Sequence, residues 1–121
     1  MTMKRMVLEA TVMILTIILA VGVVMAAGDL AKGKASFEQI CASCHGTSGK
    51  GDGPAAVALS PKPRDLTDKK YVSGLKDDYI KKLVKEGGQA VGKSPLMPPM
   101  GSALKDADIE NIIAYVYSLG K

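Results

Sequence analysis

Five consecutive residues, Cys41-Ala42-Ser43-Cys44-His45, have the types and spacing needed to hold a porphyrin. Two thiols three positions apart can each add to one vinyl group of a haem, which gives two thioether bonds. The neutral imidazole that follows can bind the iron as its proximal ligand. The motif therefore predicts covalent attachment of one haem c through Cys41 and Cys44, with His45 as a metal ligand.

The same cysteine spacing also occurs in redox disulfides and in zinc sites. A disulfide oxidoreductase would surround the motif with a βαβ pattern, which this sequence does not show. A structural zinc site needs four ligands, but the chain has two cysteines and one histidine, all inside the motif. These counts favour haem over zinc. A thiol–disulfide protein without haem stays open as an alternative.

Residues 1–27 have the layout of a secretory signal peptide. A basic start precedes an almost continuous apolar stretch over residues 10–25, and Ala26 and Ala27 follow where signal peptidase cuts. We expect cleavage after Ala26 or Ala27 and export to the periplasm, with residues 28–121 as one haem domain. The alternative is a retained membrane anchor facing the periplasm, because the apolar stretch is near the lower length limit for crossing a bilayer.

The charge and composition of the remaining chain limit its partners. Removing residues 1–27 lowers the formal charge from +4 to +3. The sequence has no basic helix with interleaved aromatic residues, so we expect no nucleic acid as partner. It has no tryptophan and a single phenylalanine, Phe37. A haem would supply the apolar core that so short a domain lacks, and we therefore expect the apo-protein to be poorly folded.

Three amphipathic segments and no β-alternation predict an all-α fold. The segments are Leu30–Ile40, 75–87 and 104–119. Asp29 is the expected N-cap of the first, where Gly33 and Phe37 share one face. The expected core residues of the other two are Ile80, Leu83, Val84, Ile109, Ile112, Ile113 and Val116.

The residues between the motif and the second helix are expected to be irregular. Four glycines and a proline within residues 46–54 mark a loop that would wrap the proximal side of the haem. The carbonyl of Pro54 is the candidate acceptor for the second ring N–H of His45. Arg64, the only arginine after residue 27, could bind a haem propionate through both guanidinium arms. A solvated loop arginine is the alternative.

Residues 87–94, Gly-Gly-Gln-Ala-Val-Gly-Lys-Ser, match the phosphate-loop pattern G-x-x-x-x-G-K-[ST]. A phosphate loop follows a strand and opens a helix. Here a helical pattern precedes the match, and three prolines follow within five residues. We interpret the match as coincidence and expect no bound nucleotide.

A second iron ligand has to be a methionine if it comes from this chain, because His45 is the only histidine. Met97 and Met100 are the methionines that remain after residue 27, and they flank a pair of prolines. A neutral thioether raises the reduction potential of haem iron, and the prolines stiffen the backbone that would carry it. The residues alone leave both methionines open as ligands, or as gap-filling apolar side chains.

The motif, the glycine-rich loop, the Met97-Pro98-Pro99 segment and the closing helix together resemble small class I c-type cytochromes of the bacterial periplasm. The resemblance implies the all-α class I cytochrome c fold, with three main helices and loops around one haem c. Its first and last helices cross, which would place Gly33 and Phe37 against Tyr115. It also implies that Met97 is the ligand, with Met100 as the alternative. Lys105 departs from relatives that often carry Ser or Thr as a helix cap.

With both axial positions filled and no carboxylate pair or nucleophile triad, we expect an electron carrier and not an enzyme. Redox partner proteins would dock at the exposed haem edge, where Lys50, Lys62 or Lys93 could steer an acidic partner. One alternative is a membrane-tethered cytochrome subunit of a larger oxidoreductase, if residues 1–27 are retained. Another is a gas sensor or peroxidase in which the methionine dissociates from the iron.

Overall fold

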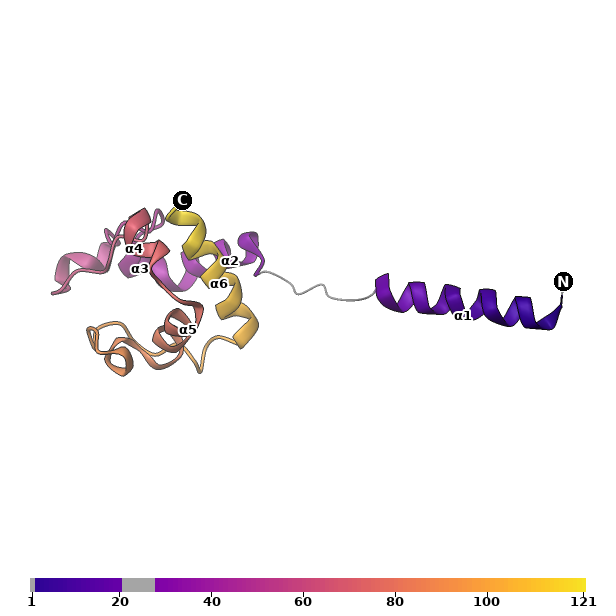
Figure 1. The fold of residues 1–121 in the computed structure, drawn as a ribbon. Coiled ribbons are helices and arrows are strands. Elements are labelled where there is room, and N and C mark those ends of the chain that lie inside the picture. Colours follow the sequence, from indigo (N-terminus) through magenta and orange to yellow (C-terminus); the bar gives the residue numbers. More distant parts are fainter. Residues whose placement is uncertain (1, 21–27) are drawn as a thin grey trace.

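The computed structural model describes residues 2–20 and 28–121, in which every regular element is a helix or helical turn (Figure 1). The helices are α1 (Met3–Ala20), α2 (Leu30–Ser36), α3 (Ala42–His45), α4 (Lys69–Ser73), α5 (Asp77–Glu86) and α6 (Asp106–Leu119). A π-helical turn, η1 (Phe37–Cys41), and two 3₁₀ turns, η2 (Pro54–Ala58) and η3 (Gly88–Val91), complete the set. The predicted all-α class is confirmed.

The N-terminal helix α1 stands apart from the other helices in Figure 1. Within residues 2–20 and 28–121, no helix combines the length and apolarity required for a membrane span. The two expected cleavage positions, Ala26 and Ala27, lie outside the described residues. Cleavage after either residue therefore stays a prediction.

The helical run that carries the cysteine motif is longer than the sequence predicted. It was expected to end near Ile40, but α2, η1 and α3 follow one another without a break to His45. The run contains no glycine or proline between Gly33 and Gly46, where the backbone turns to a φ of 79°. In η1 the N–H of Ala42 donates to the carbonyl of Phe37, the wider i→i+5 spacing of a π turn. The motif therefore sits at the C-terminal end of this run.

Helix α2 crosses α6 with the two backbones in close contact. A Cβ atom on Gly33 would overlap the carbonyl oxygen of Asn111, so only glycine fits at this point. The side-chain oxygen of Asn111 accepts a hydrogen bond of 2.7 Å from the N–H of Asp29. The ring of Phe37 lies edge-on to Tyr115, with centroids 5.3 Å apart. The predicted crossing is confirmed, with Gly33 at its closest point.

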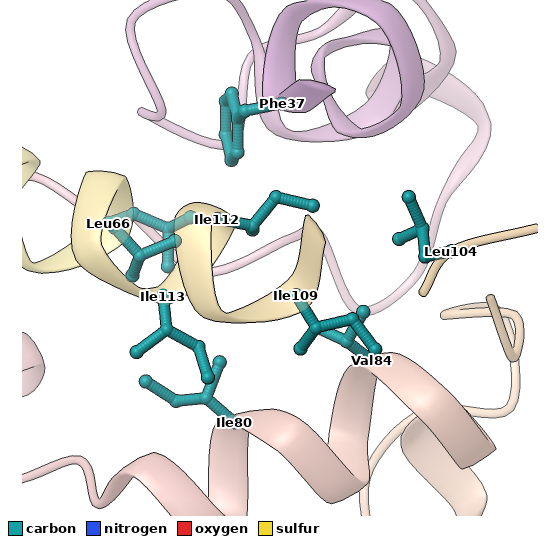
Figure 2. Close-up of a cluster of buried hydrophobic side chains, with 9 residues drawn as sticks. Phe37, Leu66, Ile80, Val84, Leu104, Ile109, Ile112 and Ile113 are labelled. Atoms are coloured by element: carbon teal, nitrogen blue, oxygen red, sulfur yellow. The ribbon is translucent and has the colours of Figure 1, made fainter. Parts of the chain in front are cut away.

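The hydrophobic core is built on α6, with α5 packed on one side and Phe37 on another (Figure 2). Its buried residues are Phe37, Leu66, Ile80, Val84, Leu104, Ile109, Ile112, Ile113 and Val116. The predicted stripe of α6 is entirely buried. In α5 the prediction holds for Ile80 and Val84, whereas Leu83 is half-buried and lines a cavity described below.

Helix α6 begins without a Ser or Thr cap. Lys105 occupies the N-cap position, and its side chain has no acceptor atom to offer. The carboxylate of Asp108 instead accepts a hydrogen bond of 3.0 Å from the backbone N–H of Lys105. This is the returning half of a capping box, and it fixes the helix start without a Ser or Thr side chain.

Candidate haem site

A cavity of about 390 Å³ opens beside the cysteine motif. Five of the predicted site residues line it together: Cys41, Cys44, His45, Arg64 and Met97. Pro54 and Met100 do not line it. Much of the remaining wall is apolar and comes from the core, so core side chains face a space that they do not fill.

His45 contributes an imidazole whose Nδ1 atom is buried without a hydrogen-bond partner among the described residues. Burial lowers the pKa of His45 below its ordinary value. The backbone of Arg64 partly opposes this shift of the pKa but does not complete a hydrogen bond to Nδ1. Such an orphaned nitrogen is costly, and the ring that carries it lines the cavity. The predicted bond from the ring N–H of His45 to the Pro54 carbonyl is not formed at Nδ1 and stays a prediction.

The two thiols are free and half-buried. Burial, with a smaller contribution from Cys44, raises the pKa of Cys41 to about 11. A cysteine that exchanges disulfides needs a lowered pKa and a stable thiolate. The environment of Cys41 is the opposite, which argues against the thiol–disulfide alternative.

The glycine-rich loop folds back on the end of α3 and holds the motif in place. The N–H groups of Gly51 and Gly53 donate to the carbonyls of His45 and Cys44, at 2.8 and 3.1 Å. Gly53 also lies so close to the Ser43 carbonyl that a Cβ atom there would overlap it. The last carbonyls of the helix, which would otherwise lack partners, are thus bonded by the loop that was expected to wrap this side of the site.

One edge of the cavity carries a cation and two phenols. The guanidinium carbon of Arg64 lies 4.2 Å from the ring centroid of Tyr71. Tyr79 also lines the cavity, and its pKa is raised by burial first and by Tyr71 second, with Arg64 opposing. Sequence reasoning missed both tyrosines. Asp68, which caps α4 by accepting a bond of 3.1 Å from the N–H of Tyr71, was the available signal.

The structure separates the two candidate methionines. Met97 is half-buried and lines the cavity, while Met100 packs against the hydrophobic core. The backbone N–H of Met100 donates to the carbonyl of Val84 at 2.8 Å, which ties this residue to α5. Of the two methionines, Met97 is therefore the one that lines the same cavity as His45.

These donors fit a porphyrin-bound iron better than a bare ion. Across the part of the chain that the structure describes, no group of three or more His, Cys, Asp or Glu side chains could hold a metal ion. The site combines two thiols and an imidazole from one short segment with a thioether from a distant segment and with apolar walls. These are the features that covalent haem requires.

The segment that matches the phosphate-loop pattern follows α5 and not a strand. Its backbone donors are used within the chain, because Gly88 donates to the carbonyl of Met97 and Lys93 donates to the carbonyl of Gly88. The N–H of Gly92 donates to Gln89. These amides do not converge on a common anion position as a phosphate loop requires.

Comparison with known proteins identifies the family. Residues 30–120 match the model of the Cytochrome c family. Cytochrome c-554(547) of Halothiobacillus neapolitanus is 34% identical over 96 residues, which cover 77% of this chain and 99% of that protein. The CcoP subunit of the Cbb3-type cytochrome c oxidase of Rubrivivax gelatinosus is 36% identical over 89 residues, covering 74% of this chain but 25% of the subunit.

A solved structure agrees at the level of the fold. A chain of the Kuenenia stuttgartiensis reducing HAO-like protein complex superimposes with a TM-score of 0.62 at 22% identity, over 80% of this chain and 45% of that one. The family match spans the whole haem domain, and the cysteine motif and the cavity it borders agree with that match. The chain therefore belongs to the cytochrome c family, as a small class I electron carrier with one covalently attached haem c.

Proposed function

We propose that the protein is an exported electron carrier in which His45 and Met97 are the two axial ligands of the haem iron. The observation that carries this proposal is that Met97, and not Met100, lines the same cavity as His45. The bound haem supplies one-electron exchange between ferrous and ferric iron. Because two side chains of the chain would fill both axial positions, no position is left for a substrate, and the protein is a carrier and not an enzyme.

The walls of the cavity would set the reduction potential along with the ligands. A thioether stabilises ferrous iron, and apolar walls limit solvent access to the site. Phe37 lies 6.2 Å from the His45 ring, between centroids, and restricts the ring's movement on the core side. Arg64, which stacks on Tyr71, is proposed to bind a haem propionate at the polar edge of the cavity.

Redox partners are proposed to dock at the mouth of this cavity. Lys62 and Lys93 are exposed and line it, and no acidic side chain does. Lys50 is exposed as well but lies outside the lining. A cationic rim of this kind favours an acidic partner surface and a rate of association that falls with salt.

We propose that residues 1–27 act as a signal peptide for export to the periplasm. The basic start and the small residues Ala26 and Ala27 support this proposal. N-terminal sequencing of the exported protein tests it. A new terminus at Ala27 or Gly28 is expected, whereas an intact Met1 on membrane-bound protein would favour the tethered alternative.

The ligand assignment is tested by absorption spectra of purified Met97→Ala and Met100→Ala holoproteins. We expect Met97→Ala to lose the thioether–ferric charge-transfer band and Met100→Ala to keep it, since only Met97 lines the cavity. Survival of the band in Met97→Ala would refute the assignment. Rapid binding of carbon monoxide to the reduced wild-type protein, without loss of fold, would instead favour a gas sensor or peroxidase.

A further inference from the structure

We propose that Gly88 is the positioning residue that fixes the thioether of Met97 toward the haem iron. On this view the first residues of the segment that imitates a phosphate loop, 87–94, hold in place the ligand-bearing loop, which is residues 93–100 with Met97 among them. The inference rests on the proposed role of Met97 as axial ligand.

Gly88 is buried and contacts the ligand-bearing loop through its whole backbone. Its N–H donates to the carbonyl of Met97 at 2.9 Å, and its own carbonyl accepts from the N–H of Lys93 at 2.8 Å. Its Cα faces the carbonyl of Ser94 so closely that an added Cβ atom would overlap that oxygen. The same Cβ would lie 3.2 Å from the Cβ of Met97. Because Gly88 has no side chain, its backbone can bond both Met97 and Lys93 while lying against the carbonyl of Ser94.

Gly87 brings the chain from α5 into this arrangement. It is buried, and its φ of 86° is one that glycine adopts without strain. A Cβ atom there would lie 3.0 Å from the carbonyl oxygen of Met97 and 3.0 Å from the nitrogen of Pro99. The two glycines therefore let the end of α5 pass directly against the backbone on both sides of Met97.

The chain after Met97 is anchored to the same helix end. The N–H of Met100 donates to the carbonyl of Val84 at 2.8 Å, and the N–H of Gly101 donates to the carbonyl of Lys85 at 3.1 Å. These bonds use carbonyls of the last turn of α5, which have no partner within the helix. Met97 is consequently held between two fixed points, Gly88 before it and the end of α5 after it.

An added methyl group at position 88 can be accommodated only if the Ser94 carbonyl moves. Ser94 is bonded to the ligand residue itself, because its carbonyl accepts from the N–H of Met97 at 3.2 Å. Displacing Ser94 therefore displaces Met97. The thioether is a neutral, exchangeable ligand, and a shift of its backbone is expected to remove it from the iron while both covalent thioether bonds to the haem stay intact.

The test is the Gly88→Ala holoprotein. We expect loss of the thioether–ferric charge-transfer band, a fall in midpoint potential, and carbon monoxide binding to the reduced form as fast as in Met97→Ala. Covalent haem staining should be unchanged. If Gly88→Ala does not accumulate, Gly87→Ala is measured in its place, and its methyl group, 3.0 Å from the Met97 carbonyl, should weaken the same band.

Two matched variants separate positioning from general destabilisation. Gly33→Ala adds a methyl group that overlaps a backbone carbonyl equally closely, but at the α2–α6 crossing. It should lower the melting temperature and keep the band. Gly92→Ala lies in the same segment, 87–94, and its φ of 72° strains any residue with a Cβ atom, but that Cβ meets nothing within 4 Å. This variant should also keep the band.

The outcomes distinguish the two proposals. A band of wild-type strength in Gly88→Ala, or in Gly87→Ala where that variant is used, overturns the positioning role; if Met97→Ala has lost the band, the ligand assignment stands. Loss of the band in Gly33→Ala as well would show that any destabilisation releases the thioether, and this too overturns the positioning role. A band that survives in Met97→Ala removes the ligand assignment itself and the inference with it.

Discussion

At the scale of single residues, Tyr117 joins α6 to the residues that begin α5. Its hydroxyl donates to the carboxylate of Asp77 at 2.7 Å, with the carbonyl of Leu75 as a second acceptor at 3.0 Å. Burial first, and then Asp77, raise the pKa of Tyr117 to about 12 from an ordinary value of 10.0. The neutral phenol is therefore the form that the folded protein favours.

Removing this hydroxyl in Tyr117→Phe should lower the free energy of unfolding by about 1 kcal/mol near neutral pH, the usual contribution of one hydrogen bond. Because the pKa is raised in the folded state, the contribution is complete below pH 10 and is lost as the pH rises toward 12. Denaturant titrations of both proteins at several pH values measure the difference. Tyr115→Phe is the control, since no described residue bonds its hydroxyl, and an equal loss there would contradict the explanation.

Only part of the site can be predicted from sequence. Covalent attachment through Cys41 and Cys44 is predictable because it depends on local spacing. The residues themselves left Met97 and Met100 open, and only the resemblance carried by Met97-Pro98-Pro99 favoured Met97. The placement of Met97 and not Met100 on the cavity depends on backbone bonds to α5, which residue types do not reveal. Tyr71 was missed because α4 has five residues, too few for a helical periodicity.

At the scale of elements, α6 shows how a missing cap is replaced. The acidic residue in its first turn, Asp108, bonds the backbone N–H of Lys105. The complementary bond, from the N–H of Asp108 to a cap side chain, cannot form because lysine carries no acceptor, and this N–H donates to the backbone carbonyl of Lys105 at 3.0 Å instead. One of the two side-chain hydrogen bonds of the capping box is therefore missing, and a side chain with an acceptor atom at position 105 could supply it.

Lys105→Ser should complete the box and raise the free energy of unfolding by about 1 kcal/mol, as N-cap substitutions do. Thermal or denaturant melting of the holoprotein measures the gain. Lys105→Ala removes the same charge without supplying an acceptor and should give no such gain. Equal stabilisation by both variants would mean that loss of the lysine charge, and not capping, is the cause.

The helices themselves were predicted with uneven success. Residues of α5 and α6 repeat apolar side chains at helical spacing, so their core positions were predictable. The π turn η1 was not predicted, because its i→i+5 bonding leaves no mark in residue type. This is why the first helix was expected to end near Ile40 and in fact continues to His45.

At the scale of the whole molecule, the core and the haem cavity share their side chains. Six of the nine residues in the buried cluster also line the cavity: Phe37, Leu66, Ile80, Val84, Ile112 and Val116. Without a group in the cavity these side chains lose packing partners on one side. The fold is therefore expected to depend on the haem.

The double variant Cys41→Ser/Cys44→Ser, purified without haem, should lose helix content and melt without a cooperative transition. Far-UV circular dichroism on heating measures both properties. Met97→Ala is the control, because it keeps the covalently bound haem and should still melt cooperatively. A fully helical, cooperatively melting apo-protein would show that the polypeptide core is sufficient on its own.

The crossing of α2 and α6 can form only after the cysteine motif has been synthesised. The bond between Asp29 and Asn111 joins residues 82 positions apart, and contacts between such distant segments form slowly. The motif from Cys41 to His45 lies inside the loop that this contact closes. Since α6 follows the motif in the chain, both thiols are synthesised well before the crossing can form. The architecture thereby leaves an interval in which haem can reach the sulfurs of a still open chain.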